Sequence, residues 1–175
     1  PRTMEVGANS IPSLSYLVLE VTSRCNLRCL HCYQGDPGKK DLEPGTALAI
    51  LDEFGSMGGL RLAVSGGEPL LYPFFSRLNR ALEGRPYRRV LITNGLLLEG
   101  LDPADLNFEE VQFSLDGLEE GHDFLRGEGT FRRTLEQFRR ALDSGLQVSA
   151  ATVIHRRNLG ELTRLGEMLR EMGTW

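Results

Sequence analysis

The feature that most constrains this chain is the placement of its cysteines. All three lie in one window, Cys25-Asn26-Leu27-Arg28-Cys29-Leu30-His31-Cys32, and the other residues of the 175-residue sequence include none. An odd count within a single loop does not make a disulfide framework. A short loop that aims several thiolates at one point is typical of a metal centre. The fold must therefore present this window at a site.

Three interpretations of the window differ in what the thiolates hold. A structural zinc site needs four ligands in a closed tetrahedron, and His31, the one candidate for the fourth, sits between Cys29 and Cys32, where ring and thiolates compete for space. Buried thiols without a metal would make a poor core segment, because the loop also carries Arg, Asn and His. In a [4Fe–4S] cluster, three thiolates leave one iron open for a substrate or cofactor. We favour the cluster.

Apolar and β-branched runs alternate with helical patterns along the rest of the chain. This alternation predicts an α/β fold with a parallel sheet, in which right-handed crossovers curl about five βα units into a partial (β/α) barrel. A sixth strand is missing from the pattern. The cysteine window follows the first strand directly, at the edge where α/β proteins bind ligands. The predicted strands are Tyr16–Val21, Leu60–Val64, Arg89–Thr93, Val111–Leu115 and Gln147–Ile154.

Helices are predicted between these strands from apolar residues at helical spacing. Residues Phe131, Leu135, Phe138 and Leu142 give the clearest pattern, with Gly145 as the stop. The other predicted helices are Thr46–Met57, Pro73–Glu83 and a last one that Asn158 caps and Gly173 closes.

Charge and hydropathy exclude several classes of partner. The net charge is −4 and the arginines are scattered among acidic residues, so no basic stripe for nucleic acid is expected. No run of about 18 apolar residues predicts a membrane span, and the first residues do not resemble a secretory signal. We expect a cytoplasmic protein. We also expect a division into an N-terminal extension, residues 1–14, and a core, residues 15–175, that is truncated at its C-terminus and lacks an extension domain.

The motifs together resemble the radical SAM (S-adenosylmethionine) superfamily. The pattern Cys-x3-Cys-x2-Cys after a first strand, followed by Gly66-Gly67-Glu68-Pro69 after a second, is similar to that family's joint signature. The run Glu20–Cys29 resembles its peptide-modifying and cofactor-maturing subgroup, many members of which carry a SPASM or twitch extension. Weaker matches follow in the same order: Ser114-Leu115-Asp116-Gly117, His122-Asp123, Arg126-Gly127 and Gly129-Thr130-Phe131.

The resemblance implies a role for each matching position. Cys25, Cys29 and Cys32 would ligate three irons of a [4Fe–4S] cluster, and SAM would chelate the fourth. Gly66 and Gly67 would let the backbone approach the methionyl part of SAM, and Glu68 would accept hydrogen bonds from its ammonium group. The remaining implied SAM contacts are the backbone of His31 and of Ile154 at the adenine, Ser114 at the ribose or carboxylate, and Arg126 at the carboxylate.

A plain structural alternative stands beside each of these roles. In it, Gly66-Gly67 is only a tight turn and Glu68 a solvated residue, Ser114–Gly117 and Thr93-Asn94-Gly95 are strand-ending turns, and Arg126 neutralises Asp123 or Glu128. His122 and His155 are interpreted as surface or turn histidines. Leu27, Leu30 and Tyr33 are predicted to cover the cluster.

The implied chemistry is reductive cleavage of SAM to a 5′-deoxyadenosyl radical, which abstracts a hydrogen atom from substrate. It needs a low-potential electron donor, flavodoxin or ferredoxin. The substrate would be a peptide or protein, or a cofactor precursor. Two alternatives remain: a non-catalytic iron–sulfur electron-transfer or binding domain, and a structural zinc domain.

Overall fold

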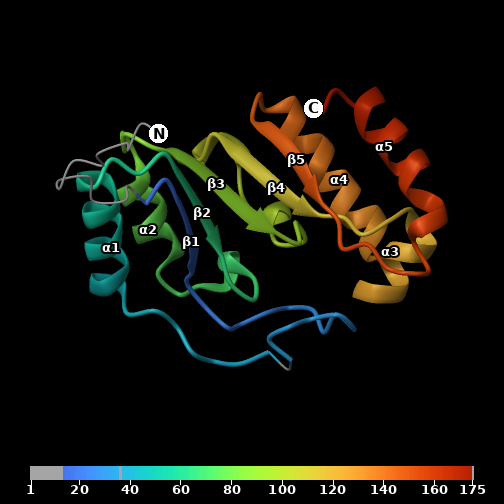
Figure 1. The fold of residues 1–175 in the computed structure, drawn as a ribbon, viewed down its shortest axis with the longest axis horizontal. Helices are drawn as coiled ribbons and strands as arrows, with labels where there is room; N and C mark the ends of the chain where they lie inside the picture. Colours follow the sequence, from blue (N-terminus) through green and yellow to red (C-terminus); the bar gives the residue numbers. More distant parts are fainter. Residues whose placement is uncertain (1–13, 36, 175) are drawn as a thin grey trace, which may run out of the picture.

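One parallel sheet organises the molecule, for which a computed structural model describes residues 14–35 and 37–174. The strands pair in chain order, and every neighbouring pair is parallel. The first and last strands do not pair with each other, so the barrel is open (Figure 1). The predicted partial barrel of five βα units is confirmed. The strands are β1 (Tyr16–Glu20), β2 (Arg61–Ser65), β3 (Arg88–Thr93), β4 (Glu110–Ser114) and β5 (Gln147–Ala151).

In the described residues, α-helices follow every strand but β3, which 3-10 turns join to β4, and α5 comes after the last strand. In Figure 1, α1 and α2 lie beside β1 and β2, while α4 and α5 lie beside β5. The helix predicted to begin at Pro73 begins at Phe75, because Pro73 and Phe74 form a turn before it. The helix α3 was not predicted. The helices are α1 (Pro44–Ser56), α2 (Phe75–Leu82), α3 (Glu119–Arg126), α4 (Thr130–Asp143) and α5 (Leu162–Glu171).

The main hydrophobic core lies between the sheet and its helices. Alternate strand residues such as Leu62, Val64 and Val111 are fully buried against Leu51 and Phe54 of α1 and other apolar side chains of the same cluster. Burial of apolar surface drives this packing at about 25 cal/mol per Å². The core fixes the strand ends, and with them the edge that carries the site.

The opposite face of the sheet carries a polar network centred on Glu110 of β4. Its carboxylate lies 3.3 Å from an Nη2 of Arg61 on β2 and 2.9 Å from that of Arg88 on β3, and it accepts a 2.6 Å hydrogen bond from Ser149 on β5. Hydrogen bonding to the arginines and serine lowers the pKa of Glu110 in spite of its burial, which alone would raise it. This network joins four strands on their concave face.

Two details of the C-terminal segment were predicted wrongly. Strand β5 ends at Ala151 rather than Ile154, and Asn158 does not cap the last helix. The Asn158 amide instead donates to the carbonyls of Asp116 (2.5 Å) and Val153 (2.8 Å), so it fastens the loop after β5 to the end of β4. None of the helices in the described part of the chain is both long and apolar enough to cross a membrane.

Candidate functional site

The cysteine loop leaves β1 and returns beside it before α1 begins. Backbone hydrogen bonds pair Leu42 with Val21 (2.8 Å) and Ser23 with Lys40 (2.8 Å), and Thr22 and Asp41 form an antiparallel bridge between them. The Asp41 carboxylate also accepts hydrogen bonds from the guanidinium of Arg24, the residue before the first cysteine. The base of the loop is therefore fixed on both sides.

The glycine turn after β2 is hydrogen-bonded to the same loop. The amide of Gly67 donates to the carbonyl of Thr22 and the amide of Glu68 to that of Arg24, both at 2.7 Å. A Cβ on Gly66 would stand 2.4 Å from the Thr22 oxygen, and one on Gly67 the same distance from the Arg24 oxygen. Side chains are thus excluded here because the turn packs against the cysteine loop. The predicted approach to SAM is a separate role, and it stays a prediction.

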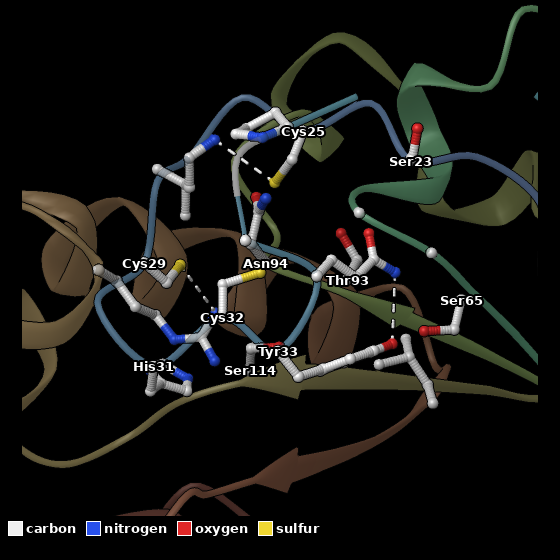
Figure 2. A pocket seen from close by; sticks show the side chains of 18 of the residues that line it. Ser23, Cys25, Cys29, His31, Cys32, Tyr33, Ser65, Thr93, Asn94 and Ser114 are labelled. Carbon is white, nitrogen blue, oxygen red and sulfur yellow. Dashed lines mark hydrogen bonds between the residues drawn. The ribbon is translucent and has the colours of Figure 1, made fainter. Parts of the chain in front are cut away.

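A cavity of about 290 Å³ opens where the strands end, close to the lower end of the usual range for small-molecule pockets. Figure 2 shows Cys25, Cys29 and Cys32 around this hollow, with Thr93 and Asn94 on its wall. The last residues of β2, β3 and β4 and the loops after β1 and β5 line it, at the edge where barrels and open α/β sheets bind ligands. The predicted site residues in its lining are Cys25, Cys29, His31, Cys32, Gly66, Gly67, Ser114 and Arg126.

The three thiols differ in their surroundings. Cys25 and Cys29 are half-buried and Cys32 is exposed. Burial raises the pKa of Cys25 and of Cys29, although the nearby Arg126 cation acts in the opposite direction on Cys29. Within residues 14–35 and 37–174, no three His, Cys, Asp or Glu side chains form a group fit for a single metal ion.

Of the three residues predicted to cover the cluster, Leu27 and Tyr33 line the cavity and Leu30 does not. Leu30 is 70% exposed and Tyr33 79% exposed, so of the three expected residues Leu27 alone is half-buried against the cavity. The Tyr33 hydroxyl instead donates to the carboxylate of Glu20 at the end of β1.

Glu68 is fully buried, so its interpretation as a solvated residue is wrong. Its carboxylate accepts hydrogen bonds from the Thr93 hydroxyl (2.7 Å), the Asn94 amide (2.9 Å) and the Leu70 amide (3.2 Å). Burial raises its pKa to about 7 against the opposing effect of these donors. Glu68 therefore lies directly behind the wall formed by Thr93 and Asn94, and its contact with the SAM ammonium stays a prediction.

Asn94, which the sequence indicated as a turn residue, also contacts the cysteine loop. Its side-chain amide donates to the side-chain oxygen of Asn26 in the cysteine loop (2.8 Å), and it lines the cavity. Asparagine after a strand is so common in turns that the sequence offered no signal for this contact.

Of Arg126 and Ile154, the first lines the cavity and the second does not. Arg126 lines the cavity and pairs with Asp116 at 2.5 Å, not with Asp123 or Glu128 as the structural alternative had it. Ile154 is 65% exposed in the loop after β5, and its neighbour Val153 is the residue that lines the cavity. His122, expected at the surface, is fully buried in α3.

Comparison with known protein families agrees with the fold and with the motifs that form this site. The family model described as the radical SAM superfamily matches residues 19–169. The chain belongs to the radical SAM superfamily. Members of this superfamily use a [4Fe–4S] cluster and SAM, which agrees with the cofactors that the motifs implied.

Two curated relatives illustrate the radical SAM subgroup. The AdoMet-dependent heme synthase of Methanosarcina barkeri is 36% identical over 167 residues, covering 88% of this chain and 46% of the relative. The PqqA peptide cyclase of Ruegeria pomeroyi is 32% identical over 182 residues, covering 97% of this chain and 47% of the relative. The resemblance to peptide-modifying and cofactor-maturing members is confirmed. The chain spans less than half the length of these relatives.

Among solved structures, Streptococcus suis SuiB bound to S-adenosylmethionine superposes with a TM-score of 0.78 at 19% identity, covering 91% of this chain and 39% of SuiB. SuiB bound to the precursor peptide SuiA gives the same TM-score. At this identity the likeness establishes the radical SAM fold.

Proposed function

We propose that this chain is the catalytic core of a radical SAM enzyme whose Cys25, Cys29 and Cys32 hold one [4Fe–4S] cluster. The observation that carries the proposal is that all three cysteines, on one loop, line a single cavity at the carboxyl-terminal edge of the sheet. Both half-buried thiols have raised pKa values, so cluster assembly would displace their protons, as metal binding to cysteine generally does.

The residues around the cavity suit SAM in charge as well as position. Arg126 places a cation in the lining, which supports its pairing with the SAM carboxylate. Ser114 contributes a hydroxyl at the end of β4, and Gly66-Gly67 a backbone without side chains. We retain His31 and Ile154 as backbone contacts for the adenine and Glu68 as the acceptor for the ammonium group.

When bound and reduced, the cluster and SAM would supply a 5′-deoxyadenosyl radical that abstracts a hydrogen atom from substrate. The chain's own residues would bind and orient SAM and limit the access of water. A flavodoxin or ferredoxin would deliver the electron.

The proposed substrate is a peptide or protein, or a cofactor precursor. PqqA peptide cyclase and SuiB with its bound precursor peptide favour the peptide, whereas the heme synthase favours the precursor. A cytoplasmic location is proposed with it, since the cluster is sensitive to oxygen.

The alternatives make distinct predictions. A structural zinc domain would use His31 as its fourth ligand, but Nε2 of His31 faces Asp116 at 3.5 Å. An electron-transfer domain would hold the cluster without SAM.

The test is anaerobic reconstitution followed by addition of SAM and dithionite. We expect about four irons per chain and release of 5′-deoxyadenosine and methionine, both lost on Cys29→Ser. A fully loaded cluster that does not bind SAM would identify an electron-transfer domain, and one zinc per colourless chain a structural zinc domain. Either result would overturn the proposal.

A further inference from the structure

Asp116, two residues after the end of β4, has no exposed surface, and each of its carboxylate oxygens has a different partner. Oδ1 accepts a 2.8 Å hydrogen bond from the amide of Val153, in the loop after β5. Oδ2 accepts a 2.5 Å hydrogen bond from Nε of Arg126, at the end of α3. The carboxylate therefore joins three segments that meet at the cavity edge.

Arg126 is held by this pair in one orientation. Its side chain is 11% exposed, and its Nη1 lies 3.9 Å from the sulfur of Cys29. Since Asp116 engages Nε, the terminal nitrogens remain turned toward the thiol and the cavity. A guanidinium fixed on one side by a buried carboxylate is preorganised, and it loses little further entropy when it binds an anion.

The cysteine loop also contacts the Asp116 carboxylate. Nε2 of His31 lies 3.5 Å from Oδ2 of Asp116, and the amide of Leu30 donates to the carbonyl of Leu125 in α3 at 2.8 Å. The loop thus docks on α3 around the point where Asp116 and Arg126 meet.

We propose that Asp116 is a positioning residue that holds the Arg126 guanidinium beside Cys29, and that through Arg126 it adjusts both the reduction potential of the cluster and the affinity for SAM. This inference rests on the proposed function. A cation held near a cluster sulfur favours the reduced cluster, which carries one more negative charge. The sequence placed Asp116 in a weak family match and a strand-ending turn, and it assigned the aspartate no role of its own.

A second aspartate of α3 provides a matched control. The Asp123 carboxylate accepts hydrogen bonds from the amides of Gly129 and Phe131, both at 2.7 Å, so it caps the start of α4. Asp123→Asn should therefore disturb the fold about as much as Asp116→Asn and leave the cluster's potential unchanged.

The experiment is a double-mutant cycle on the cluster-loaded chain with Asp116→Asn, Arg126→Met and the double variant. Asn keeps the size of Asp and an oxygen for Val153, so the fold should survive. The midpoint potential is measured without SAM, and the dissociation constant for SAM separately. We expect Arg126→Met to lower the potential and weaken SAM binding about tenfold, the effect of losing one charge-assisted contact.

Asp116→Asn should lower the potential and weaken SAM binding while Arg126 is present, because the guanidinium is no longer held beside Cys29. In the Arg126→Met background the same change should not lower the potential, since there it only removes a negative charge. Additive shifts, or equal shifts in Asp123→Asn, would overturn the inference. If the wild-type loaded chain does not bind SAM, the proposed function fails, while the potentials still decide whether Asp116 acts through Arg126.

Discussion

Asn94, at the end of β3, donates a 2.8 Å hydrogen bond from its side-chain amide to the side-chain oxygen of Asn26, between the first two cysteines. Its backbone amide is bound by Glu68, and its carbonyl accepts from Thr134 of α4 at 2.9 Å. Asn94 is thereby fixed to the sheet and to a helix. The bond to Asn26 connects that rigid framework to the loop that must hold the cluster.

Asn26→Ala should therefore shorten the lifetime of the loaded cluster. The change leaves a buried donor of Asn94 without its partner, which costs about 1–3 kcal/mol, and it frees the loop between Cys25 and Cys29. We expect iron loss to a chelator to accelerate about fivefold or more, since about 1 kcal/mol is a factor of five. Asn107→Ala, which removes a side-chain bond to Asn79 away from the cavity, is the control. Equal rates of iron loss in the two variants would refute this.

Gly67→Ala tests whether the turn after β2 requires glycine. The new methyl group would stand 2.4 Å from the Arg24 carbonyl oxygen, a backbone atom that can move only with the cysteine loop. We expect a loss of about 1–3 kcal/mol in unfolding free energy and poor cluster loading. Gly166→Ala in α5 has no atom within 4 Å of the new methyl and should stabilise by up to about 1 kcal/mol. The free energy of unfolding of both variants, measured with denaturant, tests this. Similar changes in the two variants would contradict the clash at Gly67.

The sequence predicted the parts of this molecule that depend on local pattern. Strand β2 contains a short apolar run, β4 alternates apolar and polar residues, and α4 has apolar residues at helical spacing. Helix α3 was missed because its sequence, EEGHDFLR, has only the adjacent Phe124 and Leu125 as large apolar residues, which give no helical spacing, and its N-cap Leu118 provides no side-chain cap. Its cap comes from Glu161, 43 residues away from Leu118. A contact made across the fold leaves no local signature.

The same reason separates the predicted and unpredicted parts of the site. The cysteines, the glycine turn and Arg126 could be assigned from motifs whose order in the sequence is informative. The partner of Arg126 could not, because Asp116 and Arg126 are brought together by the angle of an unpredicted helix. Burial of Glu68 and His122 likewise depends on which elements pack over them.

His122 should make stability fall in acid. Burial, with a contribution from Arg126, lowers its pKa from 6.5 to about 4, and its Nδ1 accepts the amide of Asp116. Between about pH 6.5 and pH 4, His122 is protonated in the unfolded chain but neutral in the folded chain. The contribution is thus complete above pH 6.5 and is lost as the pH falls through 4, by about 3 kcal/mol.

Glu68 acts in the opposite direction over part of this range. Its pKa is raised to about 7, so its contribution is present below pH 4.5 and disappears as the pH rises through 7. The effect of His122 must therefore be taken from the difference between wild type and His122→Gln in the metal-free chain. Urea unfolding at pH 7 and pH 5 should show that wild type loses more stability than the variant. Parallel curves would contradict a neutral, buried His122.

Glu161 should stabilise α3 although it lies in a different part of the chain. Its carboxylate accepts the amides of Leu118 (2.8 Å) and Gly121 (3.2 Å), two of the donors left free at a helix start. Glu161→Ala should lower the unfolding free energy by about 1–2 kcal/mol and Glu161→Gln by less, since the amide keeps one acceptor. Glu167→Ala, at an exposed position of α5, is the control and should have little effect.

The contact also predicts a non-additive pair, because the same carboxylate fills the space beside Gly121. A Cβ there would lie 2.5 Å from Oε2 of Glu161 and 3.1 Å from Cβ of Asn158. Gly121→Ala should thus be strongly destabilising alone and less so in the Glu161→Ala background, where the closer obstacle is gone. Thermal unfolding of the single and double variants measures the coupling. Strict additivity would show that Glu161 and α3 do not meet in solution as described, and it would also weaken the placement of Arg126, which ends the same helix.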